Sequence, residues 1–176
     1  RSMAPIFAFQ IVKIFSYGSN MSSPRLGARV SSARFVDTGY VVGRALRFHK
    51  KGRLDASGKA NILHTGAGDD RVWGVIWAID PACKPDLDRA EGLGAGYEEE
   101  GVRVQVSDGR GAGGIVRARA YVADPAYVDD RLLPYEWYLA FVLAGAREHG
   151  LPDPYVREIA RHEVETDPNG ERRLKN

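Results

Sequence analysis

The order of the periodic segments constrains the fold of this chain more than any other feature of the sequence. Segments in which apolar and polar residues alternate, as in a half-buried strand, lie between Ile11 and Ala123. Helical periodicity follows over Tyr135–His149 and Pro154–Arg161. Because the early strands are joined largely by hairpins and the helices gather late, the pattern predicts an α+β fold whose mixed or antiparallel sheet closes toward a barrel. The predicted strands cover residues 11–16, 39–49, 60–65, 71–79, 97–106 and 115–123.

Short turns supply most of the predicted strand connections. Gly66–Asp70 is predicted to join the strands on either side of it as a hairpin, and Ser107–Gly114 is predicted to be a flexible turn before the last strand. Trp73 and Trp77 lie on one face of the strand that follows the first of these turns. We therefore predict that both tryptophans fill the core or the barrel.

The chain length indicates a single domain. A chain of 176 residues corresponds to one domain, and it can bury roughly 70% of the surface that it exposes when unfolded, so it needs no metal or disulfide to fold. We place the domain at residues 3–165 and predict a mobile tail over residues 166–176, where a basic run occurs. Arg1 and Ser2 precede a methionine and are interpreted as an expression remnant.

The charge balance argues against several classes of partner. Lys and Arg number 25 against 23 Asp and Glu, which leaves a formal net charge of +2. This gives no electrostatic case for a nucleic acid or a membrane surface as partner. No apolar run approaches the ~20 residues that a membrane-spanning helix requires. A single cysteine, Cys83, favours a reducing compartment, so we predict a soluble, cytoplasmic protein.

The sequence carries no signature of a bound cofactor. The four histidines are widely scattered, no pair has the spacing of zinc ligands, and no second cysteine assists them, so no metal site is predicted. The glycine-rich stretch Gly92–Gly96 is followed by a predicted strand rather than a helix, which argues against a nucleotide-binding loop. We predict that neither a metal nor an organic cofactor is needed.

The turn Tyr17–Asn20 is the first candidate binding element. It follows the apolar strand at residues 11–16 and precedes a helix start at Ser23 and Pro24, with Ser23 as the predicted N-cap. A strand that stops in a glycine-containing turn and leads into a helix leaves backbone N–H groups unpaired, and such groups bind carboxylates, phosphates or oxyanions. The alternative, which this segment alone favours, is a tight structural connection that contains a glycine.

Glu91 is the candidate acid/base residue. The helix predicted over Pro81–Ala90 ends at Glu91 and Gly92, where the partial negative charge of the helix carbonyls gathers. This position disfavours the ionised carboxylate and predicts a raised pKa, which suits a group that takes and returns a proton near neutrality. The alternative is an exposed glutamate at a frayed helix end, and physical reasoning from the sequence does not separate the two.

Four passages follow one another along the chain: Tyr17-Gly18-Ser19-Asn20, Trp73-Gly74-Val75-Ile76-Trp77, Leu87-Asp88-Arg89-Ala90-Glu91-Gly92 and Gly145-Ala146-Arg147-Glu148-His149-Gly150-Leu151-Pro152. In this order they resemble the gamma-glutamylcyclotransferase family, and the resemblance extends from about Ile14 to about Ile159. Other branches of the family carry Tyr-Gly-Thr-Leu or Tyr-Gly-Ser-Leu in the turn, so Asn20 favours the classical branch over the amine-specific and glutathione-specific ones.

The resemblance implies a mixed β-barrel with flanking helices in a protein that is often a homodimer. It implies a pocket between the Tyr17–Asn20 turn and the glutamate of the Glu-Gly pair, which in this sequence makes Glu91 the catalytic residue. The implied partner is a small γ-glutamyl molecule, with no nucleic acid and no membrane. The implied substrate-binding residues are Tyr17, Gly18, Ser19, Asn20, Tyr97, Tyr121 and Tyr138.

The implied reaction converts a γ-glutamyl amide to 5-oxoproline and a free amine, with Glu91 as acid and base and without a cofactor. Two alternatives stay open at this point. The same cyclisation could remove a γ-glutamyl protecting group from a specialised metabolite. The domain could instead bind a small γ-glutamyl or acidic ligand without catalysis, although a carboxylate such as Glu91 gives no advantage to a protein that only binds an anion.

Overall fold

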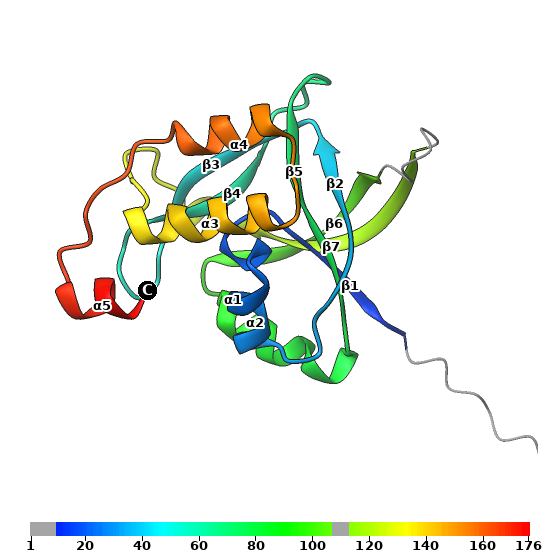
Figure 1. The fold of residues 1–176 in the computed structure, drawn as a ribbon, viewed down its shortest axis with the longest axis horizontal. Helices are drawn as coiled ribbons and strands as arrows, with labels where there is room; N and C mark the ends of the chain where they lie inside the picture. The colour runs from blue at the N-terminus through cyan, green and yellow to red at the C-terminus, as the bar shows by residue number, and fades with distance from the viewer. Residues whose placement is uncertain (1–9, 107–112) are drawn as a thin grey trace, which may run out of the picture.

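The computed structural model describes residues 10–106 and 113–176, and in this part of the chain five strands close into a barrel (Figure 1). The strands at residues 12–16 and 114–123 pair in parallel and close the barrel, and the other neighbouring pairs are antiparallel. The predicted α+β fold with a mixed barrel is therefore confirmed. In order around the barrel, the strands are β1 (Val12–Ser16), β5 (Arg71–Ile79), β2 (Arg34–Val42), β6 (Tyr97–Val106) and β7 (Gly114–Ala123). The expression remnant at residues 1–2 and most of the turn predicted at 107–114 lie outside the described residues.

A separate two-stranded antiparallel sheet consists of β3 (Arg44–Lys51) and β4 (Gly58–His64). The prediction of one strand over residues 39–49 is wrong, because Gly43, at a φ of +75°, turns the chain out of the barrel and into this sheet. The hairpin predicted around Gly66–Asp70 is also wrong, since β4 pairs with β3 whereas β5 pairs with β1 and β2. Alternation identifies residues that lie in strands, but it does not identify the partner strand.

The predicted late helices are confirmed within one residue at each end, and the predicted helix at 81–90 forms a 3₁₀ turn followed by an α-helix. No helix in the described ranges is both long and apolar enough to cross a membrane. The helices are η1 (Ser19–Met21), α1 (Ser23–Arg29), η2 (Pro81–Cys83), α2 (Lys84–Glu91), η3 (Pro125–Tyr127), α3 (Glu136–Glu148), α4 (Asp153–Ala160) and α5 (Gly170–Lys175).

The predicted N-cap of the first helix is wrong by one residue. Ser22 occupies the N-cap position of α1, and its side chain makes no capping bond. The hydroxyl of Ser23 instead donates to the carboxylate of Glu148, and the Ser23 N–H lies 3.2 Å from both oxygens of that carboxylate. The start of α1 is therefore fastened to the end of α3, which a local capping rule does not anticipate.

Two buried contacts position the chain around β1. Trp77 is 4% exposed and packs edge-on against the ring of His149 at the end of α3, so its predicted place in the core is confirmed, while Trp73 is half-buried against the same core. Gly145 of α3 lies directly against η1, since a Cβ at Gly145 would be 2.6 Å from the backbone carbonyl carbon of Met21. This close approach fixes the chain segment that follows β1.

We expect Gly145→Ala to destabilise the protein by about 1–3 kcal/mol, because the added methyl would overlap with the backbone of Met21 and force α3 away from η1. Gly27 of α1 provides the matched control, since a Cβ there meets nothing within 4 Å. Gly27→Ala should stabilise by about 0.5–1 kcal/mol, because alanine favours the helix. Urea unfolding of both variants measures the two effects, and equal effects of the same sign would contradict this packing.

Residues 166–176, for which the sequence predicted a mobile tail, include the short helix α5 beside the start of α3 (Figure 1). Asp167 is 1% exposed and accepts hydrogen bonds from Trp137 Nε1 at 2.8 Å and from Arg172 Nε at 2.6 Å. This segment contributes Arg172 to the surface that is described below. Its mobility in solution stays a prediction.

Candidate active site

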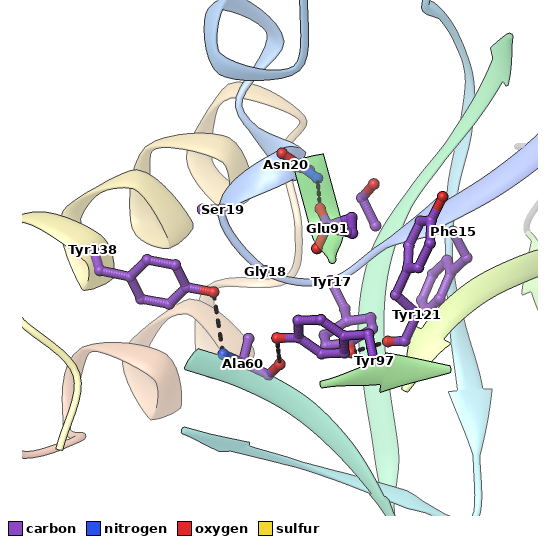
Figure 2. Close-up of a pocket in the computed structure, with 11 residues that line it drawn as sticks. Phe15, Tyr17, Gly18, Ser19, Asn20, Ala60, Glu91, Tyr97, Tyr121 and Tyr138 are labelled. Atoms are coloured by element: carbon purple, nitrogen blue, oxygen red, sulfur yellow. Dashed lines mark hydrogen bonds between the residues drawn. The ribbon is translucent and has the colours of Figure 1, made fainter. Parts of the chain in front are cut away.

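All eight predicted site residues line one small hollow, at the point where β1 leaves the barrel (Figure 2). We call it the inner hollow. Its volume is about 40 Å³, enough for one or two water molecules or a small polar group. The structure therefore brings together side chains that are spread from residue 17 to residue 138 of the sequence. The lining consists of Phe15, Ser16, Tyr17, Gly18, Ser19, Asn20, Ala60, Glu91, Tyr97, Tyr121 and Tyr138.

The Tyr17–Asn20 turn is held by the packing of β1 and η1. Gly18 lies so close to β4 that a Cβ on it would be 2.9 Å from the Cβ of Ala60. Its carbonyl accepts a bond of 3.1 Å from the N–H of Met21, which closes the single turn of η1. Within the described residues, the N–H groups of Ser19 and Asn20 have no hydrogen-bond partner, as expected for the first residues of a helical turn. These two N–H groups are available to an anionic or carbonyl oxygen.

Glu91 is the last residue of α2, and its side chain extends into the inner hollow opposite the turn (Figure 2). Gly92 ends the helix in the left-handed conformation at a φ of +71°, which agrees with the glycine stop expected from the sequence. The side chain of Glu91 is 15% exposed, and its Oε1 accepts a hydrogen bond from Asn20 Nδ2. The alternative of an exposed glutamate at a frayed helix end does not describe this carboxyl group.

The electrostatic surroundings of Glu91 pull its pKa in two directions. Burial raises the pKa of the carboxyl group above its usual value, and Arg29 and the Asn20 hydrogen bond oppose this shift. Arg29 Nη1 is 3.6 Å from Glu91 Oε1 and donates to Asn20 Oδ1 at 2.9 Å. The predicted direction of the pKa shift agrees with the structure, but its main cause is burial, whereas the sequence pointed to the helix end.

Two of the buried tyrosines fix the backbone of Ala60 in β4 (Figure 2). Tyr97 donates its hydroxyl to the Ala60 carbonyl at 2.6 Å, and the Tyr138 hydroxyl accepts from the Ala60 N–H at 3.1 Å. Burial raises the pKa of both phenols, so both stay neutral hydroxyl groups near neutral pH. They join β6 and α3 to β4 and define one side of the inner hollow.

The other two tyrosines form a chain of hydrogen bonds toward α2. Tyr17 donates to the backbone carbonyl of Tyr121, and the Tyr121 hydroxyl donates to Asp88 Oδ1 at 2.6 Å. Burial is the main reason that the pKa values of both phenols are raised. This chain joins β1 and β7 to the helix that carries Glu91, so it supports the position of the carboxyl group.

Sequence reasoning missed residues that complete the site. Arg29, which contacts both Asn20 and Glu91, carries no local signal, because a basic residue in the last turn of a helix is common. Ala60 acts through its backbone, which residue type does not reveal. The described residues contain no group of three or more His, Cys, Asp or Glu side chains arranged to hold a metal ion.

The AIG2-like family model matches residues 71–159, half of the chain, and this region includes Glu91, Tyr97, Tyr121 and Tyr138. The chain belongs to the AIG2-like family. This AIG2-like protein is 28% identical over 149 residues to the gamma-glutamylcyclotransferase of Homo sapiens and 27% identical over 148 residues to that of Bos taurus. Each alignment covers 82% of this chain and 75% of the relative. The family resemblance seen in the motifs is therefore confirmed.

Solved structures show the same fold. A protein described as a gamma-glutamyl cyclotransferase superposes on this AIG2-like protein with a TM-score of 0.82 at 24% identity, over 94% of this chain and 99% of that one. A protein from Homo sapiens superposes with a TM-score of 0.78 at 25% identity, over 95% and 99% of the two chains. The mixed barrel with flanking helices is thus the architecture of these proteins as a whole.

Proposed function

We propose that this AIG2-like protein is a gamma-glutamylcyclotransferase, an enzyme that converts a γ-glutamyl amide to 5-oxoproline and a free amine. The observation that carries the proposal is the hydrogen bond from Asn20 of the turn to the largely buried carboxyl group of Glu91, two residues that both line the inner hollow. The similarity to curated gamma-glutamylcyclotransferases over 82% of the chain supports it.

The reaction is an intramolecular aminolysis. The α-amine of the glutamyl group attacks its own γ-carbonyl carbon, a C–N bond closes the five-membered ring, and the bond to the leaving nitrogen breaks. No water is consumed and no electrons leave the substrate, so no co-reactant is required. Holding the glutamyl group bent, with its α-amine against its γ-carbonyl, supplies the proximity term, which can reach ~7–11 kcal/mol in well-oriented systems.

Glu91 carries the proton between the two nitrogens. The α-amine is mostly protonated near neutral pH and cannot attack, so a base must first remove its proton. The Glu91 carboxylate takes this proton and then delivers it to the leaving nitrogen. The second proton, which the attacking nitrogen loses as the ring closes, is taken up by the released amine, which leaves as an ammonium ion. Burial raises its pKa toward the working pH, while the contacts with Asn20 and Arg29 keep the ionised form accessible.

The turn orients the substrate and stabilises charge. The N–H groups of Ser19 and Asn20 have no partner among the described residues and border the inner hollow, so they can hold the α-carboxylate or the oxyanion that forms at the γ-carbonyl. Asn20 supports the assignment to the classical Tyr-Gly-Ser-Asn branch, because its amide bonds directly to Glu91 and a leucine could not. A cytoplasmic location and a homodimer belong to the same proposal and come from the sequence and the family resemblance.

The leaving amine extends away from the ring-forming atoms. The inner hollow shares Ser19, Glu91, Tyr97 and Tyr138 with a larger outer hollow of about 360 Å³. An amide nitrogen beside Glu91 can therefore carry a substituent into the outer hollow while the γ-carbonyl group of the substrate lies at the inner one.

Incubation of the purified protein with γ-glutamyl dipeptides tests the proposal directly. We expect release of 5-oxoproline in a one-to-one ratio with the free amino acid, measured by chromatography with mass detection. Release of glutamate in place of 5-oxoproline would indicate hydrolysis and would reject the ring closure. Binding of the dipeptides without release of any product would favour a non-catalytic binding domain.

A further inference from the structure

The outer hollow beside Glu91 has a strong excess of basic side chains, and we call it the basic basin. It is lined from η1, α1, β3, the β3–β4 connection, β4, α2, β6, α3 and the C-terminal segment. The side-chain carboxylates on its wall belong to Glu91 and Asp55. The basic side chains are Arg25, Arg29, Lys50, Arg53, Lys59 and Arg172.

Half of these basic groups are already neutralised. Arg29 contacts Glu91, Lys59 Nζ lies 2.9 Å from Asp55 Oδ2, and Arg172 is paired with Asp167. The remaining three groups, Lys50, Arg53 and Arg25, take part in no ion pair within the part of the chain that the structure describes. Positive charge on the wall of the basic basin is therefore left without a counterion.

Lys50 is the most unusual of these groups because it is buried. The residue is only 3% exposed, and its ammonium group lies 4.4 Å from the centre of the Tyr97 ring. Gly96 leaves the space for it, since a Cβ at Gly96 would be 2.7 Å from Lys50 Cε. Burying an ammonium group without an anion is costly, and a contact with an aromatic ring offsets only part of that cost.

The other two groups extend the positive surface outward. Arg25 stacks over the Phe141 ring at 4.5 Å, and its buried Nε has no hydrogen-bond partner within the described residues. Arg53 is exposed at the mouth of the basic basin. A hollow lined by one sign of charge concentrates ligands of the opposite sign, and unpaired donors on its wall favour ligands with oxygen anions.

We propose that the basic basin selects γ-glutamyl amides whose leaving amine carries two or more anionic groups, such as an acidic amino acid, and rejects leaving amines that carry a net positive charge. This inference rests on the proposed cyclotransferase function and assigns its substrate class. Lys50 and Arg53 are the residues that recognise the second anion. A leaving amino acid has one carboxylate in any case, and an acidic side chain supplies the other.

The test compares three dipeptides of similar size: γ-glutamyl-glutamate, γ-glutamyl-glutamine and γ-glutamyl-lysine. We expect kcat/KM for 5-oxoproline release to be at least about tenfold higher with glutamate than with glutamine, which corresponds to one charge-assisted contact, and lowest with lysine. The preference for glutamate should shrink as the salt concentration rises. Equal rates for the three compounds, or a preference for lysine, would overturn the charge selection and leave the cyclotransferase function in place.

Variants assign the preference to named residues. Lys50→Met should reduce the glutamate-to-glutamine ratio toward one, and Arg53→Gln, at an exposed position that does not risk the fold, should reduce it in the same direction. Lys51→Met is the matched control, since Lys51 is the neighbouring residue on β3, is exposed and does not line the basic basin. An unchanged ratio in both Lys50→Met and Arg53→Gln would overturn the assignment.

A binding measurement separates this inference from the proposed reaction. Calorimetric titration of the Glu91→Gln variant with γ-glutamyl-glutamate and with γ-glutamyl-glutamine compares the two ligands without turnover. Tighter binding of the glutamate compound supports the charge selection, even if the wild-type protein releases no 5-oxoproline and the proposed reaction fails. Equal affinities would count against the basic basin as a selective subsite.

Discussion

Glu91→Gln should lower kcat/KM for 5-oxoproline release by roughly 10²–10⁴-fold, because glutamine cannot take the proton of the α-amine or return one to the leaving nitrogen. Glutamine has nearly the same shape and can still accept the hydrogen bond that Asn20 donates. Ligand binding should therefore be largely retained. Glu98→Gln is the matched control, since Glu98 is exposed on β6 and outside the inner hollow, and it should leave the rate unchanged. Substantial residual activity in Glu91→Gln would reject Glu91 as the acid/base residue.

The same variant should show a stability change that depends on pH. The pKa of Glu91 is raised in the folded protein, so the folded state binds its proton more tightly than the unfolded chain does. The wild-type protein therefore loses stability as the pH rises from the unfolded pKa through the folded pKa, and Glu91→Gln avoids this loss. We expect urea unfolding to show the variant gaining stability relative to the wild type between acidic and neutral pH, and a pH-independent difference would contradict the raised pKa.

Asn20→Leu should lower kcat/KM by roughly ten- to a hundredfold, the range expected for the loss of a hydrogen bond to a charged group of about 1.5–3 kcal/mol. The Asn20 hydrogen bond lowers the pKa of Glu91, so its removal should raise that pKa and shift the acidic limb of the pH–rate profile to higher pH.

The pH profile separates this role from simple structural damage. Asn20→Asp places a second carboxylate against Glu91 while keeping an acceptor for Arg29, so it should shift the acidic limb further than Asn20→Leu. A reduced rate with an unchanged profile in both variants would show that Asn20 supports the fold but does not tune Glu91.

The sequence left two substrates open for the cyclisation, a γ-glutamyl amide of an amino acid or amine and a specialised metabolite with a γ-glutamyl protecting group. Selection for an anionic leaving group disfavours any cationic compound among them. Removal of a γ-glutamyl protecting group from a cationic metabolite would place positive charge against Lys50 and Arg53, whereas an acidic leaving group would neutralise the charges of these two side chains. The ratio of glutamate to lysine dipeptide rates therefore bears on the substrate class as well as on the two residues.

The local features of this protein follow from short stretches of its sequence. The apolar β1 with its glycine-containing turn, the helix stop at Gly92 after Glu91 and the periodicity of α3 and α4 each depend on residues within one or two helical turns of one another. Such features leave a readable pattern because backbone conformation and burial repeat at a fixed spacing. Motifs in a fixed order then pointed to the family.

Which of these features come into contact depends on long-range packing in the folded chain. Asn20 and Glu91 are 71 positions apart, and their contact depends on packing of α2 against the chain that follows β1. The pairing of β4 with β3, the burial that raises the pKa of Glu91 and the burial of Lys50 at the basic basin arise in the same way. Contacts between residues distant in sequence follow no period, so no sequence pattern predicts them. The reacting groups could be identified from the sequence, but their partners, their burial and the charge around them depend on the folded chain.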